Sequence, residues 1–169
     1  MKRLVELKEG DILAIPLFTS DAPSNTSFKK NDLENKGKEF AFCRVVSDEQ
    51  GAGYIIEIFD LIGSINEPLP NIIAAHRLFE PVAISGLGVY KKRWRKIHHQ
   101  ESYDKSKDSG FDDVKLVLGT EDDLRLWQNG KETPITMIKA QQFEFWSIWQ
   151  PAKLEKRIIK ALFWIGSKI

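Results

Sequence analysis

Cysteine is almost missing from this chain, which has one such residue, Cys43, among its 169. A single thiol excludes an internal disulfide and any cysteine-based metal cluster, and it fits a protein of the reducing cytoplasm. Cys43 stands inside an apolar stretch, where a free thiol is generally a small buried hydrophobe. We therefore expect it to be structural rather than a catalytic nucleophile.

Long hydrophobic runs are missing as well. No stretch reaches the roughly 18 consecutive apolar residues that indicate a membrane-spanning helix. The chain starts with basic residues, but Glu6 and Glu9 follow where an export signal requires a continuous apolar region. We therefore expect a cytoplasmic protein with no export signal and no membrane partner.

The chain also lacks a surplus of positive or negative charge, and it contains no complete catalytic motif. Lys and Arg number 25 and Asp and Glu 24, a net charge of +1, so bulk electrostatics favours neither nucleic acid nor an acidic membrane. Ser85-Gly86-Leu87-Gly88 lacks the third glycine and the helix of a phosphate-binding loop. No Gly-x-Ser-x-Gly elbow of an α/β-hydrolase occurs. We expect no cofactor.

The most informative stretch that is present runs from Gly10 to Leu17. It opens with a Gly-Asp turn and continues without a polar residue, which predicts a strand covered on both faces. Pro16 donates no ladder hydrogen bond, so it should lie at a bulge, an edge or the end of that strand. Two further apolar runs, 40–46 and 54–59, predict an antiparallel meander with it.

The second half of the chain contains one clear hairpin and one clear helix. Asn129-Gly130 between two strand-like runs is the signal of a type I′ turn. Pro151 precedes apolar residues at helical spacing, which predicts an amphipathic helix that Gly166 can end. We expect short strands at 3–7, 94–98 and 142–150, and the 61–81 segment stays open.

These elements predict an α+β fold: a mainly antiparallel β sheet or partly open barrel with a C-terminal amphipathic helix packed on it. At this length one domain, residues 1–169, is the default. Polar stretches at about 19–38 and 100–113 are expected to be surface loops, and loops of such length in a compact domain are disordered or functional.

The segment from Lys91 to Lys96 is the strongest local patch, with five cations around Trp94. We favour a solvated basic turn with Trp94 anchored in the core. The same residues, within segment 90–99, would also suit a nucleic-acid-binding β-domain, through phosphate contacts and base stacking. A third interpretation is a recognition surface for an acidic protein.

Metal and acid–base sites have weaker support. His98 and His99 are neighbours on a predicted strand and point to opposite faces, so they cannot chelate one ion together. The acidic group 121–123 is most simply a solvated turn. An enzyme that uses His98, Asp112 or Asp113 is the least supported hypothesis, because no triad, metal spacing or phosphate loop is complete.

The order of several motifs resembles a known family. Segments 10–17, 40–46 and 55–60 are similar to the opening of the Imm26 (immunity protein 26) family of bacterial polymorphic toxin systems. Lys92-Arg93-Trp94-Arg95-Lys96-Ile97 resembles its basic strand with a tryptophan. Phe145-Trp146-Ser147-Ile148-Trp149 and Glu155-Lys156-Arg157-Ile158 resemble its closing strand and helix.

The resemblance implies an α+β protein without enzymatic activity that binds and silences a cognate toxin domain, as in contact-dependent growth inhibition. It carries over neither catalytic residues nor a shared contact surface, and the oligomeric state stays open. From polarity and loop character we expect the toxin contacts in three segments, 19–38, 90–99 and 100–113. The candidate residues are Phe28, Lys29, Lys30, Asp32, Arg93, Arg95, His98, His99, Tyr103, Asp112 and Asp113.

Overall fold

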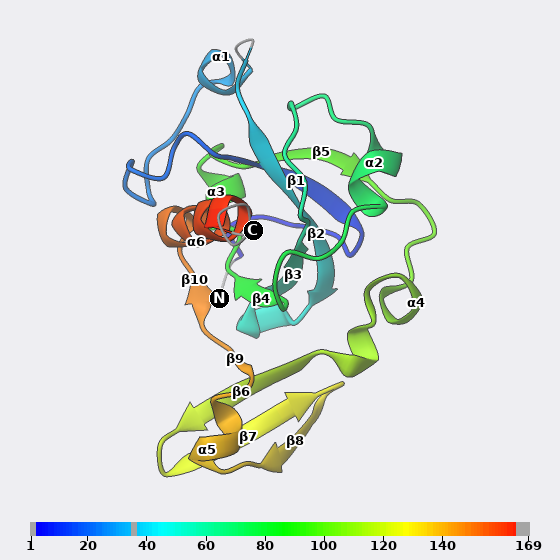
Figure 1. The fold of residues 1–169 in the computed structure, drawn as a ribbon, viewed down its shortest axis with the longest axis vertical. Helices are drawn as coiled ribbons and strands as arrows, with labels where there is room; N and C mark the ends of the chain where they lie inside the picture. The colour runs from blue at the N-terminus through cyan, green and yellow to red at the C-terminus, as the bar shows by residue number, and fades with distance from the viewer. Residues whose placement is uncertain (1–2, 35–36, 165–169) are drawn as a thin grey trace.

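The structure is a computed structural model that describes residues 3–34 and 37–164 (Figure 1). Its strands form a larger sheet, in the order β10-β4-β3-β2-β1-β5, and a smaller sheet, in the order β8-β7-β6-β9. Most neighbouring strands are antiparallel, and both sheets are open in the described chain. The fold is therefore α+β with a C-terminal helix, as the sequence predicts.

The elements of the larger sheet are β1 (Asp11–Pro16), β2 (Phe40–Asp48), β3 (Tyr54–Ile58), β4 (Val82–Ile84), β5 (Arg95–His99) and β10 (Ile148–Trp149). Those of the smaller sheet are β6 (Lys115–Thr120), β7 (Asp123–Gln128), β8 (Lys131–Pro134) and β9 (Glu144–Phe145). The helices are α1 (Lys30–Leu33), α2 (Leu69–Ile73), α3 (Leu87–Tyr90), α4 (Lys105–Ser109), α5 (Met137–Ala140) and α6 (Pro151–Trp164), with 3-10 turns η1 (Gln50–Ala52) and η2 (Phe111–Asp113).

Strand β1 lies inside the larger sheet between β2 and β5, and every one of its residues is buried. Gly10, just before it, has a φ of 97°, the left-handed conformation that the predicted turn requires. Pro16 is the last residue of the strand, where its missing N–H costs no ladder hydrogen bond. β1, β2 and β3 follow one another as an antiparallel meander, so this prediction is confirmed.

Both faces of the larger sheet carry an apolar core. On one face Leu13, Cys43 and Ile56 pack with Leu154 and Ile158 of α6. On the other face a second cluster packs under α1 and α2; it contains Ile12, Ala14, Leu33, Phe40, Phe42, Phe59 and Ile72. The long apolar runs of β1 to β3 are explained by this burial on both sides.

The smaller sheet lies at the end of the molecule opposite α1 (Figure 1). A third apolar core cluster is formed by residues of both sheets. Val46 and Ile55 of the larger sheet pack there with Leu116 and Trp127 of the smaller sheet. The turn between β7 and β8 has positive φ at Asn129 and Gly130, 50° and 79°, so the predicted type I′ hairpin is confirmed.

Four local expectations differ from the structure. The segment 19–38, expected to be a surface loop, contains α1 with the buried Leu33. Residues 142–150 form two separate two-residue strands, because β9 pairs with β6 in one sheet and β10 with β4 in the other. Residues 3–7 form no strand. Segment 100–113 contains α4, which Asp104 caps at its N-terminus and Gly110 ends in a left-handed conformation. The end of the predicted helix at Gly166 lies outside the described residues.

Candidate functional site

The basic segment 91–96 divides into a buried part and an exposed part. Arg93 and Trp94 are 0% and 1% exposed, whereas Lys92 and Lys96 are exposed and Arg95 is half-buried. The interpretation in which Trp94 is anchored in the core is therefore confirmed. A site for base stacking on Trp94 is excluded, because the ring is not at the surface.

Arg93 is held by a buried network. Its Nε and Nη2 donate to the Glu155 carboxylate over 2.6 and 2.9 Å. Nη1 donates to the Pro23 carbonyl over 2.6 Å and Nη2 to the Thr19 carbonyl over 2.7 Å. The Trp94 indole N–H donates to the same carboxylate over 2.8 Å. Arg93 therefore connects the 19–23 segment to α6.

This network removes Arg93 from the expected contact surface and leaves Phe28 partly buried. Arg93 cannot reach a partner, because solvent does not reach its side chain. The Phe28 ring lies 5.5 Å from the Arg93 guanidinium carbon and packs against the second core cluster. Both residues hold the 19–28 segment in place.

A surface hollow brings together candidate residues from two distant segments. It has a volume of about 630 Å³ and lies between β5, α1 and the loop before α2. We call it the edge hollow; its lining residues are Lys30, Glu34, Ile65, Asn66, Arg95, Lys96, Ile97 and His98. Lys29 and Asp32, also exposed, stand beside Lys30 in the chain.

Charges in the edge hollow are unequally satisfied. Lys96 Nζ lies 3.2 Å from the buried Asp11 carboxylate, and Lys30 Nζ lies 3.8 Å from Glu34. Arg95 has neither an ion pair nor a hydrogen bond among the described residues, and its Nε is shielded from solvent. Arg95 is therefore the uncompensated cation of the hollow.

The two histidines of β5 have separate partners. His98 Nε2 lies 2.8 Å from the Glu67 carbonyl, and His99 Nδ1 lies 2.8 Å from Asp11 Oδ1. Since both acceptors are oxygens, each of these ring nitrogens must carry the proton. No group of three metal-ligating side chains exists in the described part of the chain.

The remaining candidates, Tyr103, Asp112 and Asp113, lie around α4 and η2, away from α1 (Figure 1), and none of them lines the edge hollow. The Tyr103 hydroxyl lies 2.5 Å from Ser109 Oγ, which hydrogen-bonds Glu57. Asp112 accepts from Ser106 Oγ over 3.1 Å. Among the described residues no hydrogen bond or ion pair joins His98 to Asp112 or Asp113, so the structure brings no acid–base pair together from them.

Glu57 is the centre of a second buried network. It receives Arg44 Nε over 3.1 Å and Arg77 Nη2 over 3.2 Å, and both Arg44 and Glu57 are 3% exposed. Arg44 Nη2 also donates to the Asp108 carbonyl over 3.0 Å. Since Arg44 and Glu57 are buried and paired with each other, the network ties α4 to the sheet, and Arg77 is its partly exposed member.

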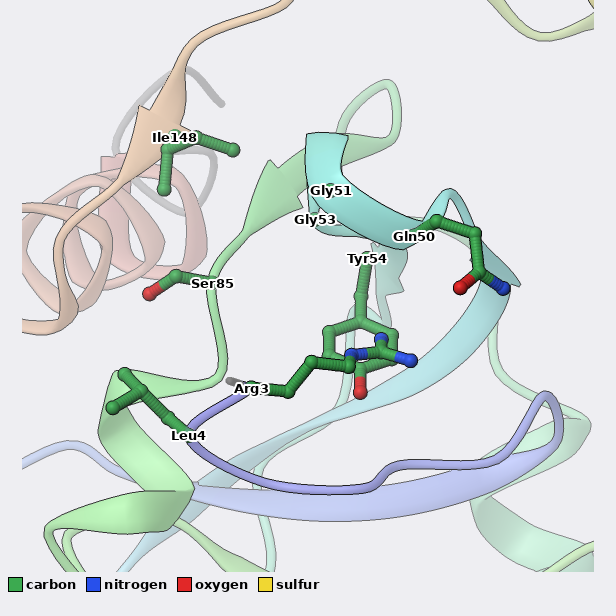
Figure 2. A pocket seen from close by; sticks show the side chains of 8 residues that line it. All are labelled: Arg3, Leu4, Gln50, Gly51, Gly53, Tyr54, Ser85 and Ile148. Atoms are coloured by element: carbon green, nitrogen blue, oxygen red, sulfur yellow. The ribbon is translucent and has the colours of Figure 1, made fainter. Parts of the chain in front are cut away.

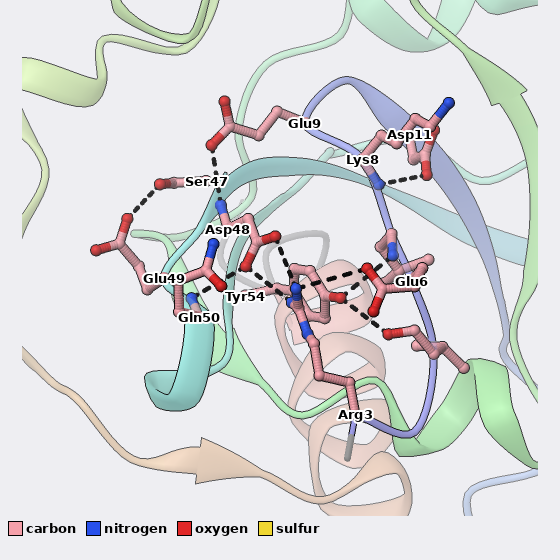
Figure 3. Close-up of polar contacts among 12 residues, drawn as sticks. Arg3, Glu6, Lys8, Glu9, Asp11, Ser47, Asp48, Glu49, Gln50 and Tyr54 are labelled. Atoms are coloured by element: carbon pink, nitrogen blue, oxygen red, sulfur yellow. Dashed lines mark hydrogen bonds and ion pairs between the residues drawn. The ribbon is translucent and has the colours of Figure 1, made fainter. Parts of the chain in front are cut away.

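A second, smaller cavity of about 250 Å³ lies where the N-terminal segment meets η1 and β10 (Figure 2). Arg3 lies along its wall, with its guanidinium carbon 4.5 Å from the centre of the Tyr54 ring. Asp48 accepts two hydrogen bonds from Arg3, over 2.9 and 2.8 Å (Figure 3). The Arg3 guanidinium lowers the pKa of the Asp48 carboxyl. The charged group at this cavity is therefore already satisfied.

The single thiol is fully buried in the first core cluster, and this burial raises its pKa. A thiol with a raised pKa is a poor nucleophile at neutral pH. Cys43 is therefore a core residue, as the sequence indicates.

Sequence reasoning did not find the acidic partners of these basic residues. Glu155 lies 62 positions from Arg93, and Asp11 lies 88 positions from His99. Asp11 begins an apolar run, where a charged residue must be paired, but Glu155 stands among lysines and an arginine and carries no such signal. Which base pairs with which acid depends on the sheet order.

Comparisons with known proteins agree with the resemblance. The family model of immunity protein 26, Imm26, matches residues 8–124, from the turn before β1 into β7. No curated protein and no solved structure matches the chain. No described helix has the length and apolar character needed to cross a membrane. The match includes β5 and every lining residue of the edge hollow, and the chain belongs to the Imm26 family, whose members are immunity proteins of toxin–immunity systems.

Proposed function

We propose that this protein neutralises a cognate bacterial toxin domain by binding it and covering its active site or substrate path. Family membership supports a toxin as the partner. We choose the edge hollow as the site because Arg95 lies in it. Arg95 is half-buried, and its side chain has no partner in the described chain. Arginine anchors in partly desolvated pockets are typical of the residues that dominate protein interfaces.

The contact surface proposed here extends from the edge hollow over α1. It includes Arg95 and His98, with the exposed Lys29, Lys30 and Asp32 at its border. A stable complex buries about 800 Å² on each partner, so further residues around the hollow must take part. His99 lies on the same strand, while Tyr103, Asp112 and Asp113 form a separate candidate region.

Neutralisation of this kind needs no chemistry from the immunity protein. Binding alone stops the toxin if the complex dissociates more slowly than the toxin would meet its substrate. We place the encounter in the cytoplasm of a cell that uses contact-dependent inhibition or a related polymorphic toxin system. The buried thiol of Cys43 is compatible with a reducing compartment.

Nucleic acid is not the partner that we propose for segment 90–99. Arg93 and Trp94 are buried, so the segment offers neither the paired arginines nor the stacking ring on which that hypothesis depends. Lys96 is already compensated by Asp11. The remaining exposed cations are few compared with a phosphate-binding face.

Co-expression tests the proposed function directly. The partner would be the C-terminal domain of the large exported protein encoded beside this chain, produced with and without it. We expect the domain alone to stop growth, and this chain to restore growth and to co-elute with the domain in equal amounts. A toxic domain that this chain neither binds nor silences would overturn the proposal.

A further inference from the structure

Arg95 differs from all the other arginines of the chain. The sequence contains seven, and six of them form ion pairs within the described residues. These six are Arg3, Arg44, Arg77, Arg93, Arg125 and Arg157. Arg95 forms none, although its Nε has been removed from solvent. The Nε atoms of Arg77 and Arg125 are also shielded without an acceptor, but each of these arginines has a paired Nη group. Arg95 alone has its whole guanidinium without an acceptor among the described residues, which is unfavourable and points to an acceptor from outside them.

The edge hollow runs along the free side of the larger sheet. β5 is the last strand in the sheet order, and β1 is its only neighbour in the described chain. Four consecutive β5 residues, 95–98, line the hollow. Because consecutive residues of a strand point to opposite faces, a hollow that touches all four lies beside the strand's edge.

This edge is protected against indiscriminate pairing. The register between β1 and β5 shifts between Ile12 and Leu13, and Lys96 stands on the edge strand. Irregular register and an edge lysine are two devices that keep foreign strands away from a sheet. A segment that does settle on this edge therefore needs an additional attraction, and an unpaired arginine supplies one.

The charges in the hollow indicate which kind of group on the partner would be attracted. Asp11 compensates Lys96 and Glu34 approaches Lys30, so Arg95 is left as one localised positive charge. One planar guanidinium matches one carboxylate in a two-bond pair. A polyanion would instead need a row of free cations.

Resting on the proposed function, we propose that the edge hollow receives an extended acidic segment of the toxin. One Asp or Glu carboxylate of that segment forms a two-bond ion pair with Arg95, while the segment's backbone lies along the open side of β5. Pairing of an extended segment with a sheet edge gives affinity through the main chain, and side-chain pockets give selectivity.

Three substitutions of Arg95 test this proposal on the purified chain and the purified toxin domain. We expect Arg95→Ala to raise the dissociation constant about 30-fold or more, as for a central anchor. Arg95→Glu should raise it further, because it sets two like charges together. Arg95→Lys should recover only part of the affinity, since an ammonium cannot form the two-bond pair. Unchanged affinity in Arg95→Ala and Arg95→Glu would overturn the proposal.

A matched control and a folding check keep the result interpretable. Arg125→Ala removes an arginine of the smaller sheet that pairs with Glu132 outside the hollow, and it should bind the toxin like the unmodified chain. Because the Arg95 side chain has no partner among the described residues, its substitutions should leave the thermal unfolding midpoint within about 2 °C of the unmodified protein.

A charge exchange identifies the carboxylate itself. Acidic residues of the toxin domain are replaced one at a time by Arg, and each variant is measured against the Arg95→Glu protein. We expect one replacement to lower the dissociation constant with the Arg95→Glu protein at least tenfold. If no replacement does so, the proposed ion pair is wrong.

The outcomes separate this proposal from the proposed function. If the unmodified chain binds no toxin, both fail. If it binds and protects but the Arg95 variants do so equally, only the carboxylate pair fails. A short oligonucleotide that competes for the hollow and loses binding in Arg95→Ala, while toxin binding is unchanged, would assign Arg95 to nucleic acid instead.

Discussion

At the scale of single residues, buried ion pairs hold distant parts of the chain together. The Arg93–Glu155 pair is completely shielded from solvent, and Arg93 also satisfies carbonyls of the 19–23 segment. Charges at this depth are costly unless every group is paired. Removal of one partner leaves the other charge buried alone.

Arg93→Met is therefore expected to lower the free energy of unfolding by about 3–5 kcal/mol. Urea denaturation followed by circular dichroism measures this change. Arg125→Ala is the control: its pair with Glu132 is more than one-third exposed on both sides, and its loss should cost at most about 1 kcal/mol. Equal effects of the two substitutions would contradict the assignment of Arg93 to the core.

Tyr103 gives a pH-dependent prediction. Burial raises the pKa of its phenol from an ordinary value of 10 to about 12. The hydrogen bond with Ser109 lowers this pKa, but its effect is smaller than that of burial. The folded state thus favours the neutral phenol. Its contribution to stability is complete below pH 10 and is lost as the pH rises from 10 to about 12.

An alkaline titration of phenolate absorbance tests this expectation. The difference between the unmodified chain and Tyr103→Phe isolates one phenol, whose ionisation should be centred near pH 12. The substitution should also lower stability at neutral pH by about 1 kcal/mol, because one hydrogen bond is lost. A difference curve centred near pH 10 would show that Tyr103 is not shielded.

At the scale of elements, α6 closes one face of the larger sheet. Leu154 and Ile158 point into the first core cluster, while Lys153 and Lys156 are exposed. The helical spacing of the apolar residues produces this arrangement, and Pro151 begins the helix at a position where no N–H is needed. Glu155 is on the buried side because Arg93 and Trp94 meet it there.

Leu154→Ala should therefore cost about 2–5 kcal/mol of stability, the range for a leucine removed from a packed core. Lys156→Ala, two positions further on the exposed side, should change stability by no more than about 0.5 kcal/mol. Thermal and urea unfolding of both variants provide the comparison. A small effect of Leu154→Ala would mean that α6 is not docked as described.

At the scale of the whole molecule, the two sheets share one cluster at their junction. Phe111 and Trp146 pack edge-to-face against Trp127, with ring centres 5.8 and 5.0 Å apart. Val46 and Ile55 extend this cluster into the larger sheet. The 144–149 segment adds a covalent link, since β9 and β10 belong to different sheets.

We therefore predict that residues 1–169 unfold as one domain. Urea transitions followed by tryptophan fluorescence and by circular dichroism should coincide. Trp127→Ala should move both to lower urea concentrations, with a loss of about 3–5 kcal/mol. Two separated transitions, or a shift in one signal alone, would show that the sheets unfold independently.

The sequence alone determined the elements whose signals are local. The apolar run of β1, the Asn129-Gly130 turn and the spacing within α6 each act over a few residues, so they could be predicted. The capping residues of α4, Asp104 and Gly110, were equally local, but the surrounding polarity concealed them.

Only the tertiary structure decided which candidate residues are buried and which are accessible to a partner. Arg93 and Arg95 are separated by one position and look equivalent in the sequence. One side chain faces the core, where Glu155 arrives from a distant helix, and the other lies at the sheet edge with no acceptor in the part of the chain that the structure describes. Their difference depends on strand order and on partners far along the chain, and no short-range pattern contains that information.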